Sequence, residues 1–414
     1  MKRIAVISVH GCPVIQAGLK DAGGMNVYLL ETARALSARG LEVDIYTRHH
    51  DPLDPMIVHL TPGARVIHLP AGVTSLDKHG AYDLLPEFTR QVTAFAAKED
   101  VAYDLVASHY WLSGLVGIEL GRLWQVPHTT SFHTLAEVKR RVLPGEDEHP
   151  ERHEAEIKIA RTADQLIVWT DHESQTMIDL YGADPGRIQI VPPGVDSNRF
   201  VPTSQSEARA SLGLRDGKIV LFVGRLERLK GIDTLFVAMT HLSNHEDLKL
   251  YVAGGTHESS EMSRLKEFAA ALGITDKVVF LGSIPQVELK VYYCAADVCV
   301  LPSYYESFGF AALEAAACGK PVVASRVGGL TTVVQDGETG FLVNWRCPGP
   351  FVERLDLLLR NSDLRCEMGI AARRHAESLS WESAADRLIH AYALLLGRPG
   401  EANLDLIMKL QSAN

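Results

Sequence analysis

Short apolar runs alternate with longer amphipathic stretches along almost the whole chain. The apolar runs have the length of buried strands, and the stretches between them carry apolar residues at helical spacing, as in Val27–Ser37 and Ala155–Thr162. Strands that alternate with helices in this way predict parallel sheets covered by helices. In the first half we predict strands at Ile4–Val9, Glu42–Tyr46, Arg65–Leu69, Asp104–Ser108, His128–Phe132, Gln165–Trp169 and Arg187–Val191.

A turn-rich segment interrupts this pattern near the middle of the chain. Residues 192–200 are rich in turn formers, and residues 201–216 are polar. Further strands are then predicted at Lys218–Val223, Lys249–Ala253, Val278–Leu281, Asp297–Leu301 and Pro321–Ala324. The fold class is therefore α/β, with two doubly wound domains at 1–195 and 196–380. A C-terminal helical segment, 381–414, is expected to pack back on the first domain.

Composition narrows the range of partners and compartments. The 414 residues include 41 Lys and Arg and 51 Asp and Glu, a net charge of −10, and 46% are hydrophobic. This balance excludes a disordered chain and argues against nucleic acid as a partner. No apolar run approaches the roughly 20 residues of a membrane span, and the six cysteines form no CxxC pair. We expect a cytoplasmic protein with reduced thiols and no membrane attachment, and a homodimer is left open.

Candidate ligand-binding residues gather at predicted strand ends in the first half. Ligands of open parallel sheets bind at the carboxyl ends of the strands. His10, His109 and His133 each follow or end a separate strand, so we expect the three to share one site. Gly23 and Gly24 precede a helix, where backbone amides favour an anion.

Two signatures of other enzyme classes are missing from the sequence. The dinucleotide fingerprint GxGxxG is absent, which lowers the case for an oxidoreductase, and HExxH is absent, which excludes that class of zinc protease. His149 and His153 are assigned to a surface loop, so no metal ligand is predicted.

The second half carries cations and carboxylates at equivalent places. Arg225 follows the first strand of this half and Lys230 lies five residues later, before a helix, an arrangement suited to a diphosphate. Glu306 lies at a strand end and Glu314 within the next helix, where sugar hydroxyls could donate to both carboxylates. Glu314 stands in an apolar run, and we expect a ligand hydroxyl to be its hydrogen-bond partner. The backbone amides of residues 307–309 open the helix.

Together these residues resemble the retaining glycosyltransferases of family four. Gly23-Gly24, Gly224-Arg225 with Lys230, and Glu306-x7-Glu314 with Phe308-Gly309 match its motifs. Ala295–Val298, Val327–Gly329 and Asp336–Gly340 match as well. The resemblance covers nearly the whole chain and implies the GT-B fold, in which two Rossmann-like domains face each other across a cleft. Within the family, the first half is most similar to the D-inositol 3-phosphate glycosyltransferases of mycothiol biosynthesis, and sucrose-phosphate synthases come next.

The resemblance implies a role for each candidate residue. Glu306 would orient the donor sugar, Glu314 the nucleotide ribose, and His133 would bond the transferred sugar; Arg225 and Lys230 would stabilise the leaving diphosphate. The expected catalytic residues are His133, Arg225, Lys230 and Glu306. The expected donor contacts are Gly23, Gly24, Arg225, Lys230, Ile284, Glu306, Ser307, Phe308, Gly309 and Glu314.

The acceptor contacts are expected in the first half. Besides His10 and Asn26, the resemblance assigns Lys78, Tyr110, Thr134 and Arg152 to a phosphate on the acceptor. Two cations and two neutral donors suit a phosphate dianion, and without the phosphate we expect the cations to stay unpaired. The segment His10–Pro13 departs from the pattern of both subfamilies.

The expected reaction is retaining transfer of a sugar from a nucleotide-sugar, UDP-N-acetylglucosamine or UDP-glucose, to a phosphorylated acceptor such as inositol 3-phosphate. Transfer to fructose 6-phosphate, as in sucrose-phosphate synthases, is the alternative within the family. A sugar-nucleotide epimerase and a non-catalytic nucleotide-sugar-binding protein are the alternatives of other classes. No cofactor is expected to be required, and the ligand spacing does not imply a divalent metal such as Mg²⁺.

Overall fold

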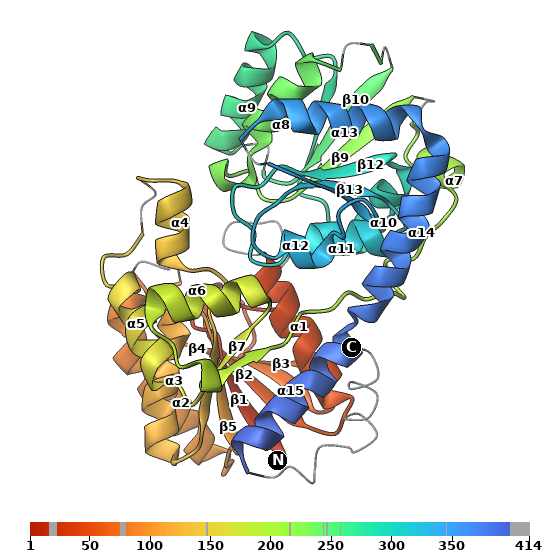
Figure 1. Ribbon diagram of the computed structural model, residues 1–414. Coiled ribbons are helices and arrows are strands. Elements are labelled where there is room, and N and C mark those ends of the chain that lie inside the picture. Colours follow the sequence, from red (N-terminus) through yellow and green to blue (C-terminus); the bar gives the residue numbers. More distant parts are fainter. Residues whose placement is uncertain are drawn as a thin grey trace. The chain divides into compact units, whose positions relative to one another are not determined.

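The computed structural model describes residues 1–15, 23–74, 80–145, 148–214, 217–242, 244–245, 247–256, 258–344 and 346–397 (Figure 1). The chain divides into two compact units, with boundaries at Pro192/Pro193, at Ser380/Trp381 and just before Gly24. The first unit holds most of the N-terminal half together with the C-terminal helix. Of the described residues, the second unit holds Gly23 and those of Pro193–Ser380.

The first unit is built on a sheet in which all but one strand are parallel. The order of its eight described strands is β3-β4-β2-β1-β5-β6-β7-β8, and β3 alone runs antiparallel to its neighbour. The strands are β1 (Arg3–Ile7), β2 (Glu42–Arg48), β3 (Ile57–Thr61), β4 (Ala64–Leu69), β5 (Leu105–His109), β6 (His128–Ser131), β7 (Gln165–Val168) and β8 (Ile188–Ile190).

Helices cover both faces of this sheet, and each face has its own apolar core. Phe88 and Val116 belong to the core on the side of α2 and α3, whereas Leu29 and Leu388 belong to the core under α1 and α15. The helices are α1 (Gly24–Ser37), α2 (Leu85–Lys98), α3 (Trp111–Trp124), α4 (Ala136–Val142), α5 (Arg152–Thr162), α6 (Asp171–Tyr181) and α15 (Trp381–Leu395), with the 3-10 turns η1 (Tyr82–Leu84) and η2 (Pro185–Arg187).

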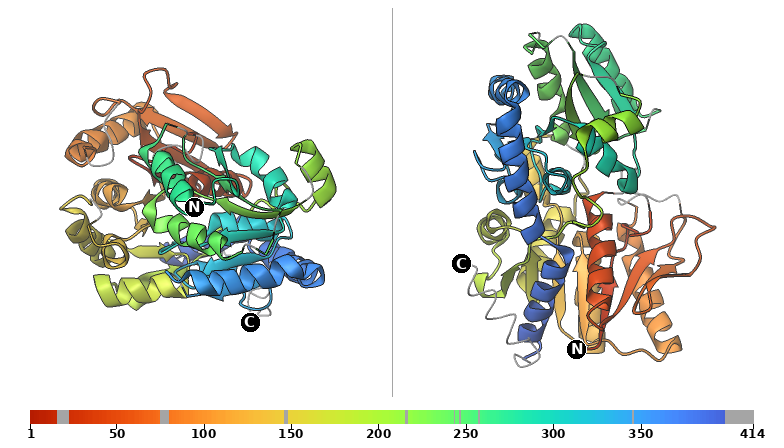
Figure 2. Two further views of the ribbon diagram at one scale, coloured as in Figure 1. Left: turned by 90° about the horizontal axis from the view of Figure 1, so that it is seen from above. Right: turned by 90° about the vertical axis from the view of Figure 1, so that its right-hand side faces the viewer.

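The C-terminal helix α15 therefore belongs to the first unit although it follows the second in sequence. It lies beside α1 in Figure 1 and in the right-hand view of Figure 2. Leu388 is 2% exposed and packs in the same core as Leu29. An ion pair between Arg39 and Asp386 ties the end of α1 to the helix.

The second unit has a fully parallel sheet. Its described strands are ordered β11-β10-β9-β12-β13-β14. They are β9 (Lys218–Val223), β10 (Leu248–Ala253), β11 (Val278–Gly282), β12 (Val298–Leu301), β13 (Val322–Ser325) and β14 (Gly340–Val343). β9 pairs with both β10 and β12, which places the end of β9 next to the end of β12.

Helices again lie on both faces of this sheet, with α8 and α13 on one side and α10 and α11 on the other (Figure 1). The helices are α7 (Gln205–Ser211), α8 (Ile232–Thr240), α9 (Ser260–Ala271), α10 (Gln286–Ala295), α11 (Phe310–Ala317), α12 (Leu330–Val333), α13 (Pro348–Arg360) and α14 (Ser362–Ser378), with the 3-10 turn η3 (Arg228–Lys230). No helix in the described part of the chain is long and apolar enough to cross a membrane.

The predicted fold class, two doubly wound α/β domains with parallel sheets, is confirmed. Two strands were not predicted, β3 and β14. β3 is a partly exposed edge strand, so its sequence lacks the continuous apolar run of a buried strand. β14 is short and begins at Gly340, where a side chain would overlap the carbonyl oxygen of Val322. All six cysteines are free, and Cys347 and Cys366 are exposed.

Candidate active site

Three histidines of the first unit lie at the carboxyl ends of neighbouring strands. The parallel register sets Ile7 of β1 opposite Ser108 of β5, and His109 opposite Ser131 of β6. His109 Nδ1 lies 2.9 Å from His133 Nε2, and the His10 ring lies 4.4 Å from the Tyr110 ring. The structure thus brings together the residues that follow β1, β5 and β6.

The His109–His133 pair is neutral. Burial lowers the pKa of His109 to about 3. The pKa of His133 is lowered well below its usual value, mainly by burial and to a smaller extent by the neighbouring His109 and His10. A hydrogen bond between two neutral imidazoles needs one donor and one acceptor, so His109 also orients the His133 ring. His133 can therefore interact with a sugar hydroxyl as a neutral hydrogen-bonding group and not as a cation.

The backbone around this cluster adopts conformations that side chains rarely tolerate. Tyr110 has a φ of 76° and His133 a φ of 62°. Such φ values are uncommon for residues other than glycine and concentrate at functional sites, where the surrounding structure compensates for the strain. Both residues turn the chain at a strand end.

Arg152 lies in a buried network with two of the other predicted acceptor residues. Its Nη2 donates to the carbonyl oxygen and the Oγ1 of Thr134 at 2.8 and 3.0 Å, and its guanidinium carbon stands 4.7 Å from the centre of the Tyr110 ring. The side chain is only 1% exposed. Tyr110, Thr134 and Arg152 therefore converge, as their joint assignment to one phosphate requires.

The expectation that Arg152 stays unpaired without a phosphate is wrong. Its Nε donates to Glu156 at 2.7 Å, its Nη1 donates to Glu148 at 2.5 Å, and Glu148 also accepts from Lys139 at 2.6 Å. Burial opposes ionisation, but the charges of Glu156 and Glu148 keep the pKa of Arg152 above its ordinary value. Isolated cations in a buried place are costly, so the fold supplies carboxylates on the same helix and on the segment before it.

Two further residues were predicted to contact the acceptor, Asn26 and Lys78. Asn26 is buried, and its Nδ2 donates to the carbonyl oxygen of Cys12 at 2.6 Å, so its amide holds the segment between β1 and α1. Lys78 lies outside the described residues.

In the second unit, Lys230 and Glu306 form an ion pair. Lys230 Nζ donates to Glu306 Oε2 at 2.6 Å, and Ser303 Oγ lies 3.4 Å from the same oxygen. The two side chains are 17% and 16% exposed. An ammonium group has three N–H donors, so the pair fixes Nζ while it leaves donors for a diphosphate.

Glycines make this pairing geometrically feasible. Gly231 has a φ of 66°, and a Cβ there would overlap the carbonyl oxygen of Pro302, which shows how closely η3 approaches the end of β12. The amide of Gly329 donates to the carbonyl oxygen of Glu306 at 2.9 Å. A Cβ at Gly328 would overlap that same oxygen. The two glycines of the Val327–Gly329 motif thus allow the loop after β13 to support the loop that carries Glu306.

The remaining predicted donor contacts occupy separate places, most of them in the second unit. Arg225 follows β9 and lies 3.1 Å from Glu227, with its side chain 46% exposed. Ser307 and Phe308 precede α11, and Gly309 caps it with a φ of 105°. Ile284 follows the edge strand β11. Gly24 opens α1 in the first unit, with Gly23 directly before it.

Glu314 already has protein partners. Gln286 Nε2 donates to its Oε1 at 2.8 Å, and the Tyr293 hydroxyl donates to its Oε2 at 2.9 Å. The expectation that a ligand hydroxyl is needed as the partner of this carboxylate is therefore wrong. Gln286 and Tyr293, both on α10, were missed because nothing in their sequence spacing relates them to Glu314. Burial raises the pKa of Glu314 to about 7, against the lowering effect of those two hydrogen bonds.

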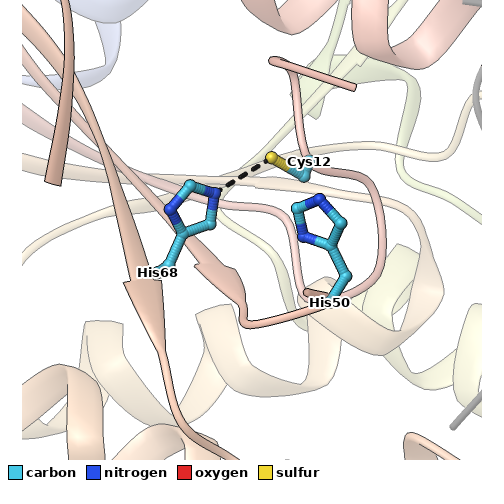
Figure 3. A group of neighbouring side chains, drawn as sticks. All are labelled: Cys12, His50 and His68. Atoms are coloured by element: carbon cyan, nitrogen blue, oxygen red, sulfur yellow. Dashed lines mark hydrogen bonds between the residues drawn. The ribbon is translucent and has the colours of Figure 1, made fainter. Parts of the chain in front are cut away.

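Among the described residues, one group of His, Cys, Asp and Glu side chains has ligand atoms close enough for a metal ion. It consists of Cys12, His50 and His68 (Figure 3). The sequence predicted no metal ligands, and none of these three belongs to the predicted donor or acceptor contacts.

Comparison with known proteins relates both units to one enzyme family. The family model for glycosyltransferase family 4 matches residues 22–199, and the model for glycosyl transferases group 1 matches residues 204–375. A D-inositol 3-phosphate glycosyltransferase of Corynebacterium jeikeium is 43% identical over 413 residues, which cover 96% of this chain and 99% of that protein. The chain belongs to glycosyltransferase family 4.

Further similar proteins support the assignment of this chain to glycosyltransferase family 4. A D-inositol 3-phosphate glycosyltransferase of Xylanimonas cellulosilytica is 40% identical, with 94% of this chain and 96% of that protein covered. The structure of a sucrose-phosphate synthase from Thermosynechococcus elongatus has a TM-score of 0.89 at 35% identity and covers 96% of this chain and all of the other. HepE of Anabaena, solved with UDP and glucose, has a TM-score of 0.74 at 18% identity over 95% of this chain and all of HepE, which shows a shared fold.

The close approach at Gly231 can be tested against a second glycine with the same backbone conformation. Gly213 has a φ of 65° and nothing within 4 Å of its Cβ position. Gly213→Ala should cost only backbone strain, about 1–2 kcal/mol. Gly231→Ala should cost more in stability and should also lower kcat/KM at least about 10-fold, because it displaces Lys230. Thermal unfolding and transfer kinetics measure the two effects, and equal losses in both variants would contradict this reading of the loop.

The raised pKa of Glu314 predicts a pH-dependent stability. The folded state retains a proton at Glu314 up to about pH 7, whereas an ordinary carboxyl group loses it near 4.5. The free energy of unfolding therefore falls as the pH rises through this window, by up to about 3 kcal/mol at this site. Glu314→Gln abolishes this contribution.

The measurement compares thermal unfolding of the wild type and Glu314→Gln at about pH 5, near the start of this window, and at about pH 8, beyond its end. The midpoint of the wild type should fall relative to that of the variant as the pH rises. Any constant cost of the substitution cancels in this comparison. Glu338→Gln is the control, because Glu338 is exposed. A difference between wild type and Glu314→Gln that does not change with pH would refute the assignment.

Proposed function

We propose that the protein transfers a sugar from a UDP-sugar to a phosphorylated polyol, with retention at the anomeric carbon and with inositol 3-phosphate as the first acceptor to test. The observation that carries this proposal is the convergence of Tyr110, Thr134 and Arg152 at the carboxyl edge of the first sheet. Relatives named D-inositol 3-phosphate glycosyltransferase, at 40–43% identity over nearly the full chain, support the same acceptor class.

We assign Arg225 and Lys230 to the binding of the donor diphosphate, and the two side chains differ in how firmly they are held. The exposed Arg225–Glu227 pair contributes no more than about 1 kcal/mol, so Arg225 can leave it for a diphosphate at little cost. Lys230 is held by Glu306, which keeps one cation in place before the donor arrives. Both would stabilise the charge that grows on the diphosphate as the bond to the sugar breaks.

The transfer step needs no protein nucleophile in this proposal. The bond between the anomeric carbon and the diphosphate oxygen breaks, and the acceptor hydroxyl oxygen bonds to that carbon on the same face. The hydroxyl proton passes to the leaving phosphate oxygen, so the products are the glycosylated acceptor and UDP. Glu306 orients the donor sugar, Glu314 accepts from the ribose, and the neutral His133 bonds a hydroxyl of the transferred sugar.

The acceptor phosphate would enter the Arg152 network by replacing a carboxylate. Breaking the fully buried Arg152–Glu156 pair would leave an uncompensated charge at a cost of about 3–5 kcal/mol. Glu148 is 15% exposed, more than Glu156, and forms ion pairs with both Lys139 and Arg152. We therefore assign Glu148 as the group that a phosphate displaces, so that one anion replaces another beside two cations. Thr134 and Tyr110 would complete the phosphate site, together with Lys78.

The proposal predicts a phosphorylated product and strong discrimination by the phosphate. The enzyme is incubated with UDP-glucose or UDP-N-acetylglucosamine and with matched acceptors, inositol 3-phosphate against inositol and fructose 6-phosphate against fructose. Mass spectrometry should detect a glycosylated sugar or polyol phosphate, and kcat/KM should be at least about 100-fold lower for the unphosphorylated partner. Equal kcat/KM within a pair contradicts the phosphate site. Donor conversion or binding without a glycosylated product favours an epimerase or a binding protein.

Glu148→Gln tests the displacement of one anion by another. Removal of the competing charge should lower KM for the phosphorylated acceptor severalfold and leave kinetics with the unphosphorylated acceptor unchanged. Glu154→Gln, on the same charged stretch and exposed, serves as the control. A higher KM for the phosphorylated acceptor in Glu148→Gln would mean that the carboxylate supports the site and is not displaced from it.

A further inference from the structure

A thiol and two imidazoles meet at the carboxyl edge of the first sheet, where β4, β2 and β1 end. Cys12 follows β1, His50 follows β2, and His68 lies in β4 (Figure 3). These three strands are neighbours in the sheet, and Thr47 of β2 pairs with His68. One ligand atom from each side chain lies within 4.8 Å of the other two.

The distances approach those of a tetrahedral zinc site. With zinc bonds of about 2.0–2.3 Å, two ligand atoms are about 3.3–3.8 Å apart. Cys12 Sγ lies 3.2 Å from His68 Nε2, so this pair is close to the lower end of that range. The ligand atom of His50 lies within 4.8 Å of the other two, so a movement of at most about 1 Å brings it to the spacing of a zinc site.

His68 is oriented as a metal ligand commonly is. Its Nδ1 lies 2.7 Å from the carbonyl oxygen of Pro55. A carbonyl oxygen only accepts, so Nδ1 carries the hydrogen and the lone pair of Nε2 faces Cys12. Most histidines that bind a metal donate the N–H of their other ring nitrogen to an acceptor in this way, which fixes the ring orientation and the tautomer.

The surroundings provide charge and access. Cys12 and His68 are 1% and 0% exposed, whereas the His50 side chain is 29% exposed and so leaves a route for an ion. His50 Nδ1 lies 3.2 Å from Asp54 Oδ2. A metal ion would release the proton of the Cys12 thiol, and the thiolate with the Asp54 carboxylate would balance two positive charges.

We propose that Cys12, His50 and His68 bind one zinc ion, with the fourth position left to water or Asp54. A thiolate with two imidazoles is a donor set that zinc prefers, and the calcium and magnesium sites of proteins use oxygen ligands instead. The three ligands come from separated segments, which is why their sequence spacing gave no metal signature.

The zinc ion would act as a structural clamp. Cys12 belongs to the segment between β1 and α1, and its carbonyl oxygen accepts from Asn26 on α1. A bond from zinc to Cys12 would fix this segment to the ends of β2 and β4, and through Asn26 would fix the start of α1. The zinc proposal does not depend on which donor and acceptor the enzyme uses.

Cobalt(II) provides a spectroscopic test on the untagged full-length protein. After removal of metals with a chelator, Co²⁺ alone should bind at about one ion per chain and produce a thiolate-to-cobalt charge-transfer band with the visible bands of tetrahedral cobalt, and Zn²⁺ should displace it. Cys12→Ser should abolish the charge-transfer band and weaken binding at least about 100-fold, more than the loss of an outer-shell partner.

Matched variants separate this site from other thiols and histidines. Cys347→Ser and His59→Gln change an exposed cysteine and an exposed histidine and should leave binding and spectrum intact. A charge-transfer band that persists in Cys12→Ser or disappears in Cys347→Ser would overturn the proposal. So would the lack of stoichiometric binding, which would leave a simple hydrogen bond between Cys12 and His68.

A ligand at the surface keeps the test decisive if a buried variant fails to fold. Circular dichroism checks the fold of Cys12→Ser and His68→Gln. His50→Gln changes the partly exposed ligand and should weaken Co²⁺ binding at least about 10-fold while the fold is retained. Unchanged affinity in a folded His50→Gln would exclude His50 from the site and overturn the three-ligand proposal.

Discussion

Parallel pairing is the constraint on which both units depend, because parallel strands all end at the same edge of their sheet. The register of β1, β5 and β6 brings together His10, Tyr110 and His133, which lie far apart in the sequence. In the second unit, Leu221 of β9 pairs with Cys299 of β12. This pairing sets the loop with Lys230 beside the loop with Glu306. The same edge of the first sheet also gathers Cys12, His50 and His68.

Charge pairing then decides which side chains are fixed and which can move. Arg152 is buried with Glu156, and separation of such a pair costs several kcal/mol, so the Arg152 side chain is held in place. Arg225 is half-exposed beside Glu227, and its pair contributes about 1 kcal/mol or less. The two arginines have the same chemistry, yet burial gives them opposite behaviour.

The sequence predicted the parallel strands and the convergence of the strand-end histidines, because both follow from local apolar patterning and one topological rule. It missed β3, whose exposed edge position weakens that pattern. It also missed the partners of Glu314 and Arg152. Gln286 and Tyr293 reach Glu314 from another helix, and no local spacing encodes such contacts. Glu156 lies one helical turn from Arg152, so its pairing could have been read from the i,i+4 spacing.

The two units differ in how their sites are built, and this difference bears on substrate choice. In the second unit, backbone approaches at Gly231, Gly328 and Gly329 hold the loop of Glu306, so most substitutions there disturb the fold as well as the site. In the first unit, side-chain networks around Arg152 and His133 form the proposed site, and an exchange at Glu148 alters a charge at a residue that lies outside the strands. Substitutions that alter the proposed acceptor site therefore need fewer compensating substitutions elsewhere than substitutions in the glycine-supported loops of the second unit. The sucrose-phosphate synthase structure with a TM-score of 0.89 and the 43% identical D-inositol 3-phosphate glycosyltransferase carry names that point to different acceptors, which agrees with that asymmetry.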